Sequence, residues 1–359
     1  MSLFRRKNEA MLGIDISSTA VKLLEFARAG KGYRVVSYSV VPLPADSVID
    51  KQIVNIDAVA GAIRQSVKKA RTSATSAVVA VSGSAVINKI MQMPANLKGD
   101  ELEQMVLLEA DQHIPYSSEE VHMDFEVLGP TEGDPDMMDV LLSASRSEYV
   151  DTRISALERA GLKAAIVDIE AFALENACDL LRHQMPTAGD AKTIAVFDIG
   201  ASMTSFTVLH DLKSVYVRDQ VFGGRQLTDS IMERYGLTFA EAGRAKKTGE
   251  GLPEGYQDEV IQPFLDDLVH MVNRSMQLFL SASAKHSHVD EVILAGGTAQ
   301  MSRTVEVIAE RLGVPVCVAD PFGQMKIDAK AKPKVLQSDA PAMLIAAGLA
   351  MRAFGPERD

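Results

Sequence analysis

The chain has 359 residues, of which 47% are apolar, and it carries a formal net charge of −11. At about 150 residues per domain, this length predicts two or three units with substantial hydrophobic cores. The negative field repels phosphate backbones and argues against nucleic acid as a partner, and the longest apolar run, residues 342–351, is about half as long as a membrane-spanning helix.

The first predicted elements are three strands within residues 11–43. In the segment GIDISSTAVKLLEF, residues 13–26, an apolar run ends on Asp15, three hydroxyl residues follow, and a second apolar run contains Lys22. This pattern predicts a strand, a tight turn and a returning strand. An amphipathic helix that Asn55 caps follows the third strand.

Residues 76–162 have a different character and predict a small α+β insert of order β-α-β-β-α. Its predicted strands include VINKIMQM, residues 86–93, and its first helix is DELEQMVLLEADQHI, residues 100–114. After the insert, a strand feeds a helix that begins near Glu170, and the polar segment 185–192 predicts a hinge.

Residues 194–209, IAVFDIGASMTSFTVL, repeat the opening stretch. Asp198 stands where Asp15 stood and Gly200 where Ser17 stood, so the chain carries two copies of one hairpin. A helical block, a strand with a Gly-Gly turn, a helix, a short strand and a final apolar helix complete the predicted elements. The repeat indicates an internal duplication of one structural unit.

Two such hairpins can face each other across a cleft between duplicated lobes. Backbone N–H groups in turns of small residues bind phosphate oxygens, and paired aspartates hold Mg²⁺ through its water shell. Lys22 would add a positive charge beside the phosphates. The pattern therefore favours a nucleoside triphosphate site over two strand-end aspartates that merely cap turns.

The layout resembles the actin-like ATPase superfamily over nearly the whole chain. GIDISSTAVK resembles its first phosphate loop, FDIGASMTS its second, ILAGGTAQM its adenosine loop, and the segments DIEAFAL and AMLIAAGLAMR its two connecting helices. The insert resembles that of the cell-division protein FtsA. Within this branch, LGIDISSTAVKLLE, EADQHIPY and the short C-terminus resemble the PilM family of type IV pilus assembly proteins.

The resemblance implies an α/β fold of two actin-like lobes, each a ribonuclease-H-like domain, with an FtsA-like α+β inserted subdomain. It divides the chain into four parts, which are a first lobe (1–75 with 163–190), the insert (76–162), a second lobe (191–222 with 287–359) and a helical subdomain (223–286).

The resemblance also implies that ATP and Mg²⁺ are the cofactors. The residues expected to bind them are Asp15, Ser17, Ser18, Thr19, Lys22, Asp198, Gly200, Ser202, Lys246, Gly296 and Gly297, with Asp15 and Asp198 next to the metal. Three departures from the family pattern are Ser17 in place of glycine, Ala201-Ser202-Met203 in place of Gly-Gly-Thr, and Gly243 in place of a ribose-binding glutamate. Because hydrolysis depends on the placement of an attacking water, we expect weak ATPase activity or none and assign no catalytic residue.

The partner that the resemblance implies is the cytoplasmic N-terminal tail of a PilN-like inner-membrane protein, with other pilus motor components as further candidates and no direct insertion into the membrane. The protein would then be a cytoplasmic scaffold at that membrane, needed for pilus biogenesis and twitching motility, and self-association stays open. Ile114, Pro115 and Tyr116 end a helix and offer an apolar rim for this partner, although a simple helix stop explains them as well.

Two alternatives remain open from the sequence. An FtsA-like membrane tether would end in a linker and a membrane-binding helix, whereas this sequence ends at AFGPERD. A small-molecule kinase of the same superfamily would need a catalytic aspartate in its insert, where Asp111 lies beside Glu109 and has the pattern of a solvated helix face.

Overall fold

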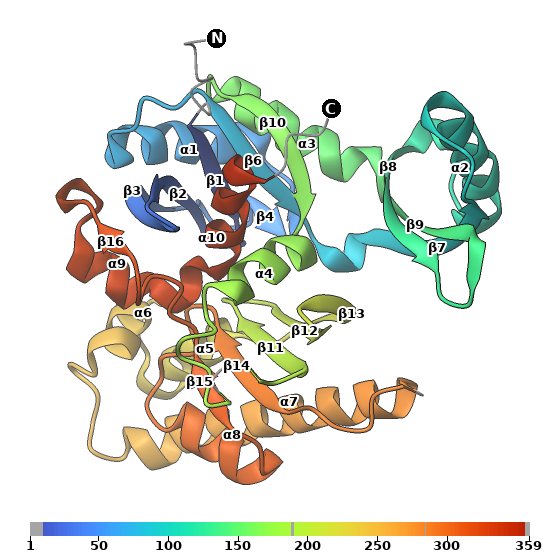
Figure 1. The fold of residues 1–359 in the computed structure, drawn as a ribbon. Helices are drawn as coiled ribbons and strands as arrows, with labels where there is room; N and C mark the ends of the chain where they lie inside the picture. The colour runs from blue at the N-terminus through green and yellow to red at the C-terminus, as the bar shows by residue number, and fades with distance from the viewer. Residues whose placement is uncertain (1–9, 188–189, 284, 356–359) are drawn as a thin grey trace.

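The computed structural model describes residues 10–187, 190–283 and 285–355. Two large β-sheets each form the centre of a lobe, and a smaller sheet stands beside the first lobe as a separate insert (Figure 1). A ribbon of two short strands, β4 (Val48–Ile49) and β5 (Gln52–Ile53), leaves the first lobe as a hairpin. The predicted two-lobe α/β architecture with an inserted subdomain is confirmed.

The first sheet has six strands. In sheet order they are β10 (Lys163–Ile169), β6 (Ser76–Val81), β1 (Met11–Ile16), β2 (Ala20–Ala29), β3 (Gly32–Pro42) and β16 (Lys326–Ile327). The three strands predicted within residues 11–43 are therefore present. β1 and β2 form an antiparallel hairpin whose register sets Asp15 opposite Lys22.

Helices α1 (Ile56–Ala70) and α3 (Ser147–Arg159) cover one face of this sheet. Because side chains alternate along a strand, Leu12 and Ile14 of β1 point into that core. The side chain of Asn55 accepts a hydrogen bond of 3.0 Å from the Ala58 N–H and caps α1, as its position in the sequence predicted.

The opposite face of the first sheet packs against α9 (Pro333–Asp339) and α10 (Leu344–Met351). A Cβ atom at Gly13 would lie 2.4 Å from the Ala346 carbonyl oxygen, so only glycine lets α10 approach β1 this closely. The chain from β16 onward thus lies on the first lobe. The sequence-based division, which gave all of 287–359 to the second lobe, is wrong for this last part.

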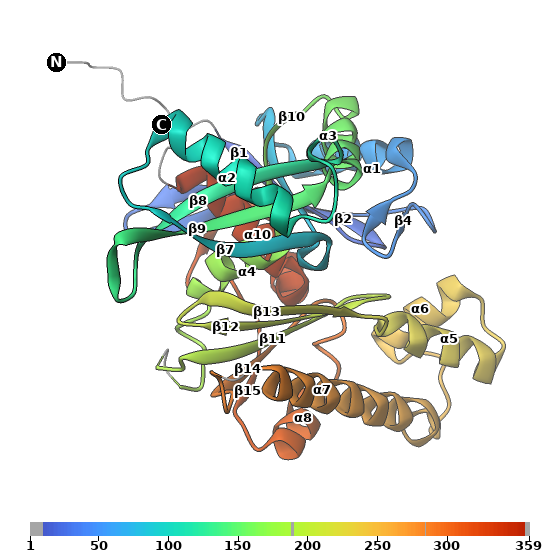
Figure 2. The same cartoon turned by 90° about the vertical axis from the view of Figure 1, so that its right-hand side faces the viewer.

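The insert consists of β7 (Val86–Pro94), α2 (Gly99–His113), β8 (Val121–Thr131) and β9 (Asp134–Arg146). β9 lies between β7 and β8, and α2 covers one face of this sheet (Figure 2). Met91 and Met93 are buried in its core, where their flexible side chains fill space.

The insert is shorter than the predicted range of 76–162. β6 lies between β1 and β10 in the first sheet, with parallel pairing on both sides, and α3 packs against α1. Both elements therefore belong to the first lobe, because their apolar residues complete its core. The separate unit runs from β7 to the end of β9.

The second sheet has the order β13 (Lys213–Gln220), β12 (Thr204–His210), β11 (Thr193–Ile199), β14 (Glu291–Ala295) and β15 (Val316–Val318). Its helices are α5 (Gly224–Tyr235), α6 (Phe239–Thr248), α7 (Gln262–Ala282) and α8 (Thr304–Leu312). The long helix α7 packs on the sheet through residues such as Leu268 and Phe279, whereas α5 and α6 lie at one end of the lobe (Figure 2).

Two helices cross at the boundary between the lobes. α4 (Glu170–Asp179) contributes Leu174 and Ala177 to a core that also holds Val196 of β11 and Leu349 of α10. A Cβ atom at Gly348 would lie only 1.8 Å from the Ala173 carbonyl oxygen, so the two helices are in backbone contact. Within residues 10–187, 190–283 and 285–355, no helix is both long and apolar enough to cross a membrane.

Candidate functional site: a cleft between two hairpin turns

The two copies of the hairpin have matching turns. Asp15 pairs with Lys22 across the first hairpin and Asp198 with Ser205 across the second, seven positions later in each case. The residue two positions after each aspartate closes the turn with its N–H, Ser17 to the Ala20 carbonyl and Gly200 to the Met203 carbonyl, both at 3.0 Å. These equal offsets support the internal duplication inferred from the sequence.

The turns meet across the boundary between the lobes. The Ser202 hydroxyl donates a hydrogen bond of 3.1 Å to the Ser18 hydroxyl. Because the side chains at both positions are small and polar, the two loops can come this close. The structure therefore brings the two predicted phosphate loops together.

A buried ion pair lies directly below the turns. Lys22 Nζ donates to Asp15 Oδ2 at 2.8 Å, and the Asp15 residue is only 8% exposed. Burial acts to lower the pKa of Lys22, but the negative charges of Asp15 and Asp198 outweigh it and hold that pKa above its usual value. Lys22 is therefore a permanently charged group held between two aspartates.

Asp198 lies against the Gly-Gly turn that follows β14. A Cβ atom at Gly296 would be 2.6 Å from Asp198 Oδ1 and 2.3 Å from the Ile199 carbonyl oxygen, and φ of Gly296 is +86°. Only glycine satisfies both conditions. Burial raises the pKa of the Asp198 carboxyl, although the charge of Lys22 opposes this shift.

A chain of contacts extends this site toward α6. Thr298 Oγ1 donates to the Gly200 carbonyl at 3.1 Å, and the N–H of Gly224 donates to the same carbonyl at 3.0 Å. Lys246 Nζ in turn donates to the Gly224 carbonyl at 2.8 Å and to Thr228 Oγ1 at 2.9 Å. Burial lowers the pKa of Lys246. The residues expected at phosphate, metal and nucleoside therefore line one continuous region.

Ser17, Thr19 and Gly297 differ in what they offer a ligand. The Ser17 hydroxyl donates to the Ala20 carbonyl at 2.9 Å, so both donors of this residue close the turn and neither points toward a ligand. Thr19 is exposed at the tip of the turn. Nothing lies within 4 Å of a Cβ atom built on Gly297, so open space adjoins the backbone there.

The donor set agrees with a magnesium ion bound largely through water. Within the parts of the chain that the structure describes, no group of three or more His, Cys, Asp or Glu side chains could hold a metal by itself. Asp15 and Asp198 supply oxygen ligands that Mg²⁺ accepts when water and phosphate complete its shell. The ion would neutralise phosphate charge between the two aspartates.

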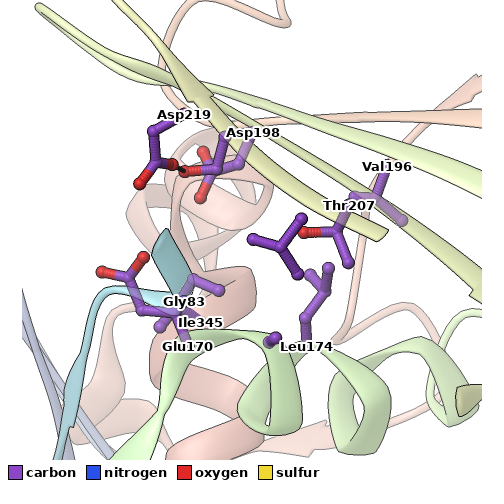
Figure 3. A pocket seen from close by; sticks show the side chains of 11 residues that line it. Gly83, Glu170, Leu174, Val196, Asp198, Thr207, Asp219 and Ile345 are labelled. Atoms are coloured by element: carbon purple, nitrogen blue, oxygen red, sulfur yellow. Dashed lines mark hydrogen bonds between the residues drawn. The ribbon is translucent and has the colours of Figure 1, made fainter. Parts of the chain in front are cut away.

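Sequence reasoning missed a second polar cluster in the same cleft. Lys51 Nζ lies 2.6 Å from Glu170 Oε2, 2.6 Å from Ser205 Oγ and 3.1 Å from Asp219 Oδ1. Figure 3 shows the carboxylates of Glu170, Asp198 and Asp219 at the same end of a pocket between the lobes. No local motif marks Lys51, because its three partners come from α4, β12 and β13.

The residues expected at a partner surface differ in their exposure. Ile114 is 6% exposed and packs in the core of the insert, so it cannot form an apolar rim. Its N–H donates to the Ala110 carbonyl at 2.8 Å, which ends α2 as the helix-stop interpretation requires. Tyr116 is 42% exposed, and the Arg146 guanidinium lies 5.6 Å from the centre of its ring.

Two duplicated lobes, joined by two crossing helices and facing each other through paired hairpins, define an actin-like ATPase fold. A family model described as type IV pilus assembly protein PilM matches residues 13–354, and the chain belongs to this family. A solved structure described as the PilM-PilN type IV pilus biogenesis complex is 27% identical, with 96% of this chain and 99% of that chain covered and a TM-score of 0.77. The ethanolamine utilization protein EutJ from Carboxydothermus hydrogenoformans has a similar fold, with 14% identity, coverage of 95% and 89%, and a TM-score of 0.55.

Proposed function

We propose that this protein is an ATP-binding scaffold of type IV pilus assembly that docks the cytoplasmic tail of a PilN-like inner-membrane protein. The observation that carries the proposal is the likeness to the solved PilM-PilN complex, which extends over nearly the full length of both chains. Family membership favours this function over a division tether and over a small-molecule kinase.

ATP with Mg²⁺ is the ligand that best fits the cleft. Asp15 and Asp198 would hold the magnesium ion through its water shell, and Lys22 and the hairpin turns would face the phosphates. Gly296 and Gly297 would lie beneath the nucleoside, with Lys246 at its far side. The Asp198 carboxylate close to Gly296 and the open space at Gly297 support this arrangement.

Slow hydrolysis, or none, follows from the same site. The donors of Ser17 are used to close the first turn, and Ala201 and Met203 stand in the second turn where the resemblance implies smaller or hydroxyl residues. Binding tolerates such changes better than the alignment of an attacking water does, because alignment depends on sub-ångström placement. A turnover of several per second would contradict the scaffold proposal, since that is an ordinary enzymatic rate.

The insert is the proposed docking unit. Of the twelve exposed large apolar side chains in the described part of the chain, six lie between β7 and the end of β9, namely Ile90, Leu107, Leu108, Tyr116, Val127 and Leu128. This share of the exposed apolar side chains on one small unit favours the insert as the interaction surface. Strands β7 and β8 are also edge strands within the insert, so an extended peptide could add to the sheet.

Attachment to the membrane would therefore be indirect and peripheral. The net charge of −11 favours basic residues in the partner tail, and binding should weaken with added salt. Isothermal titration calorimetry with a synthetic tail peptide tests the docking. The comparison variant replaces residues 86–146 by a short Gly-Ser linker, which can join the ends because Val86 lies opposite Ser145.

This replacement leaves β6 and α3 in place, so the first sheet is kept intact. We expect the variant to bind ATP like the wild type and to lose peptide binding. Capture of the peptide by the insert-free variant would show that the docking site lies elsewhere. If the wild-type protein does not bind ATP, the nucleotide part of the proposal is refuted.

A further inference from the structure

One lysine joins both lobes, and none of its contacts belongs to the predicted nucleotide residues. Lys51 comes from the β4–β5 hairpin of the first lobe, whereas Ser205 and Asp219 belong to the second lobe and Glu170 begins α4. The Lys51 ammonium donates hydrogen bonds to Glu170 and Ser205, and it forms an ion pair with the Asp219 carboxylate at 3.1 Å. Its side chain is 20% exposed, so solvent screens the contacts only in part.

Asp219 extends the same cluster to the insert. The Asp219 carboxylate accepts hydrogen bonds from Ser82, at 2.7 Å, and from Ser84. Ser82 and Ser84 flank Gly83 in the turn that leads directly into β7. The Asp219 carboxylate of the second lobe therefore contacts both Lys51 of the first lobe and the turn of residues 82–84, which we call the root of the insert.

The backbone around this cluster is held in an uncommon geometry. Asp50 and Lys51 have φ values of +47° and +63°, the left-handed region that a two-residue hairpin of type I′ requires. Neither residue is glycine, so the conformation is strained. Arg153, which is 3% exposed, supports it by donating to the Lys51 carbonyl at 2.9 Å and to the Ala80 carbonyl at 2.6 Å.

The turn at Gly83 packs closely against the second lobe beside this cluster. A Cβ atom at Gly83 would lie 2.9 Å from Val217 Cγ1, so the turn at the root of the insert touches β13 of the second lobe. Burial acts to raise the pKa of Asp219, but Lys51 and the serine hydroxyls hold it below its usual value. The Asp219 carboxylate is therefore charged whenever the cleft is closed.

We infer that Lys51 is a positioning residue that holds the two lobes in the closed arrangement. Through Asp219 it also holds the root of the insert against the second lobe. The inference rests on the proposed function and deepens it. It assigns to this cluster the coupling between the position of the two lobes around the nucleotide cleft and the position of the insert that docks the partner. Opening of the lobes would separate Lys51 from Ser205 and Asp219. Opening would also break the hydrogen bonds of Ser82 and Ser84 to Asp219, so the backbone of β7 would become more mobile.

The test uses hydrogen–deuterium exchange of the full chain without nucleotide, on wild type, Lys51→Met and Asp219→Asn. We expect amide exchange in residues 204–220 and 86–94 to accelerate about tenfold in both variants, since truncating one partner of a buried ion pair leaves the other uncompensated. Lys68→Met, which changes an exposed lysine of the first lobe, is the matched control and should exchange like wild type. The double variant should exchange no faster than the worse single variant, because the two residues act as one unit.

A less disruptive double substitution tests the inference even if Lys51→Met or Asp219→Asn fails to fold. Ser82→Ala with Ser84→Ala removes the hydrogen bonds that the two serine hydroxyls donate to Asp219, and should accelerate exchange in residues 86–94 while β1 and β2 stay protected. Unchanged exchange in both segments for Lys51→Met, or in 86–94 for the serine variant, would overturn the inference. Calorimetry with ATP on the same samples keeps the two proposals separate, because wild type that fails to bind ATP refutes the nucleotide site and leaves the exchange result standing.

Discussion

Ser202 donates a hydrogen bond of 3.1 Å to Ser18, although 184 positions of sequence separate the two residues. Each belongs to the turn of one copy of the duplicated hairpin, so the bond joins equivalent loops of the two lobes. The contact places Asp15 and Asp198 on either side of one cleft.

Asp15→Ala is expected to weaken ATP binding at least tenfold, which corresponds to about 1.4 kcal/mol. The substitution removes a proposed metal-side carboxylate and leaves Lys22 without its partner at 2.8 Å. Isothermal titration calorimetry with MgATP measures the change. Asp57→Ala is the control, because Asp57 is exposed on α1 and pairs with Arg159 far from the cleft. Equal affinities in wild type and Asp15→Ala would rule out this site.

Gly296→Ala and Gly297→Ala should differ in their effect on the free energy of unfolding. At Gly296 the new methyl group would clash with Asp198 and the Ile199 carbonyl at a φ of +86°, so we expect a loss of about 1–3 kcal/mol in the free energy of unfolding. At Gly297 the methyl group meets no atom within 4 Å, so stability should be unchanged. Urea denaturation compares the two variants, and a stable Gly296→Ala protein would contradict the described turn.

Gly348→Ala should separate the two crossing helices. The added methyl group would lie 1.8 Å from the Ala173 carbonyl oxygen, a backbone atom that cannot move aside, and the cost should reach the upper end of about 1–3 kcal/mol. Gly61→Ala in α1 is the matched change in open space, and should instead stabilise the protein by about 0.5–1 kcal/mol. Thermal unfolding of both variants provides the measurement, and similar melting temperatures would argue against helix contact at Gly348.

The two carboxylates that share Lys51 should respond to pH in opposite directions. The pKa of Asp219 is lowered, because Lys51 and the serine hydroxyls outweigh burial, so its stabilising contribution is complete above the ordinary value of 3.8 and disappears as pH falls further. The pKa of Glu170 is raised, because burial outweighs the charge of Lys51, so its contribution is complete below 4.5 and is lost as pH rises through the raised pKa.

Urea denaturation at pH 8, 6 and 5 separates these cases. The difference in the free energy of unfolding between wild type and Asp219→Asn should stay constant over this range. Wild type should gain stability relative to Glu170→Gln as the pH falls, because the buried Glu170 carboxyl then takes up a proton. A constant difference for Glu170→Gln would show that burial does not control this carboxyl.

Local sequence patterns were sufficient to predict the repeated unit of the fold. Apolar runs predicted β1, β2 and β3, Asn55 predicted the start of α1, and the repeat of Asp15 at Asp198 predicted the second hairpin. These features depend on neighbouring residues and on a period that can be counted along the chain. The same patterns placed Gly296 and Gly297 in a turn that follows a strand.

Domain boundaries were less accessible to the same reasoning. β6 and α3 have the same local signals whether they belong to the insert or to the first lobe, since a strand does not identify the sheet that it joins. Pairing with β1 and β10 decided the place of β6. Likewise, the apolar helix α10 could have covered either lobe, and the glycine contacts at Gly13 and Gly348 set it on the first lobe and against α4.

By itself the sequence determined that two equivalent hairpins exist and that each ends a strand on an aspartate, because both facts follow from order and period along the chain. Tertiary structure alone decided that Ile114 is buried and that Lys51 reaches Glu170, Ser205 and Asp219. The exposure of an apolar residue at a helix end depends on what packs over it. The partners of a lysine depend on which segments of distant sequence fold within the few ångströms that its side chain spans.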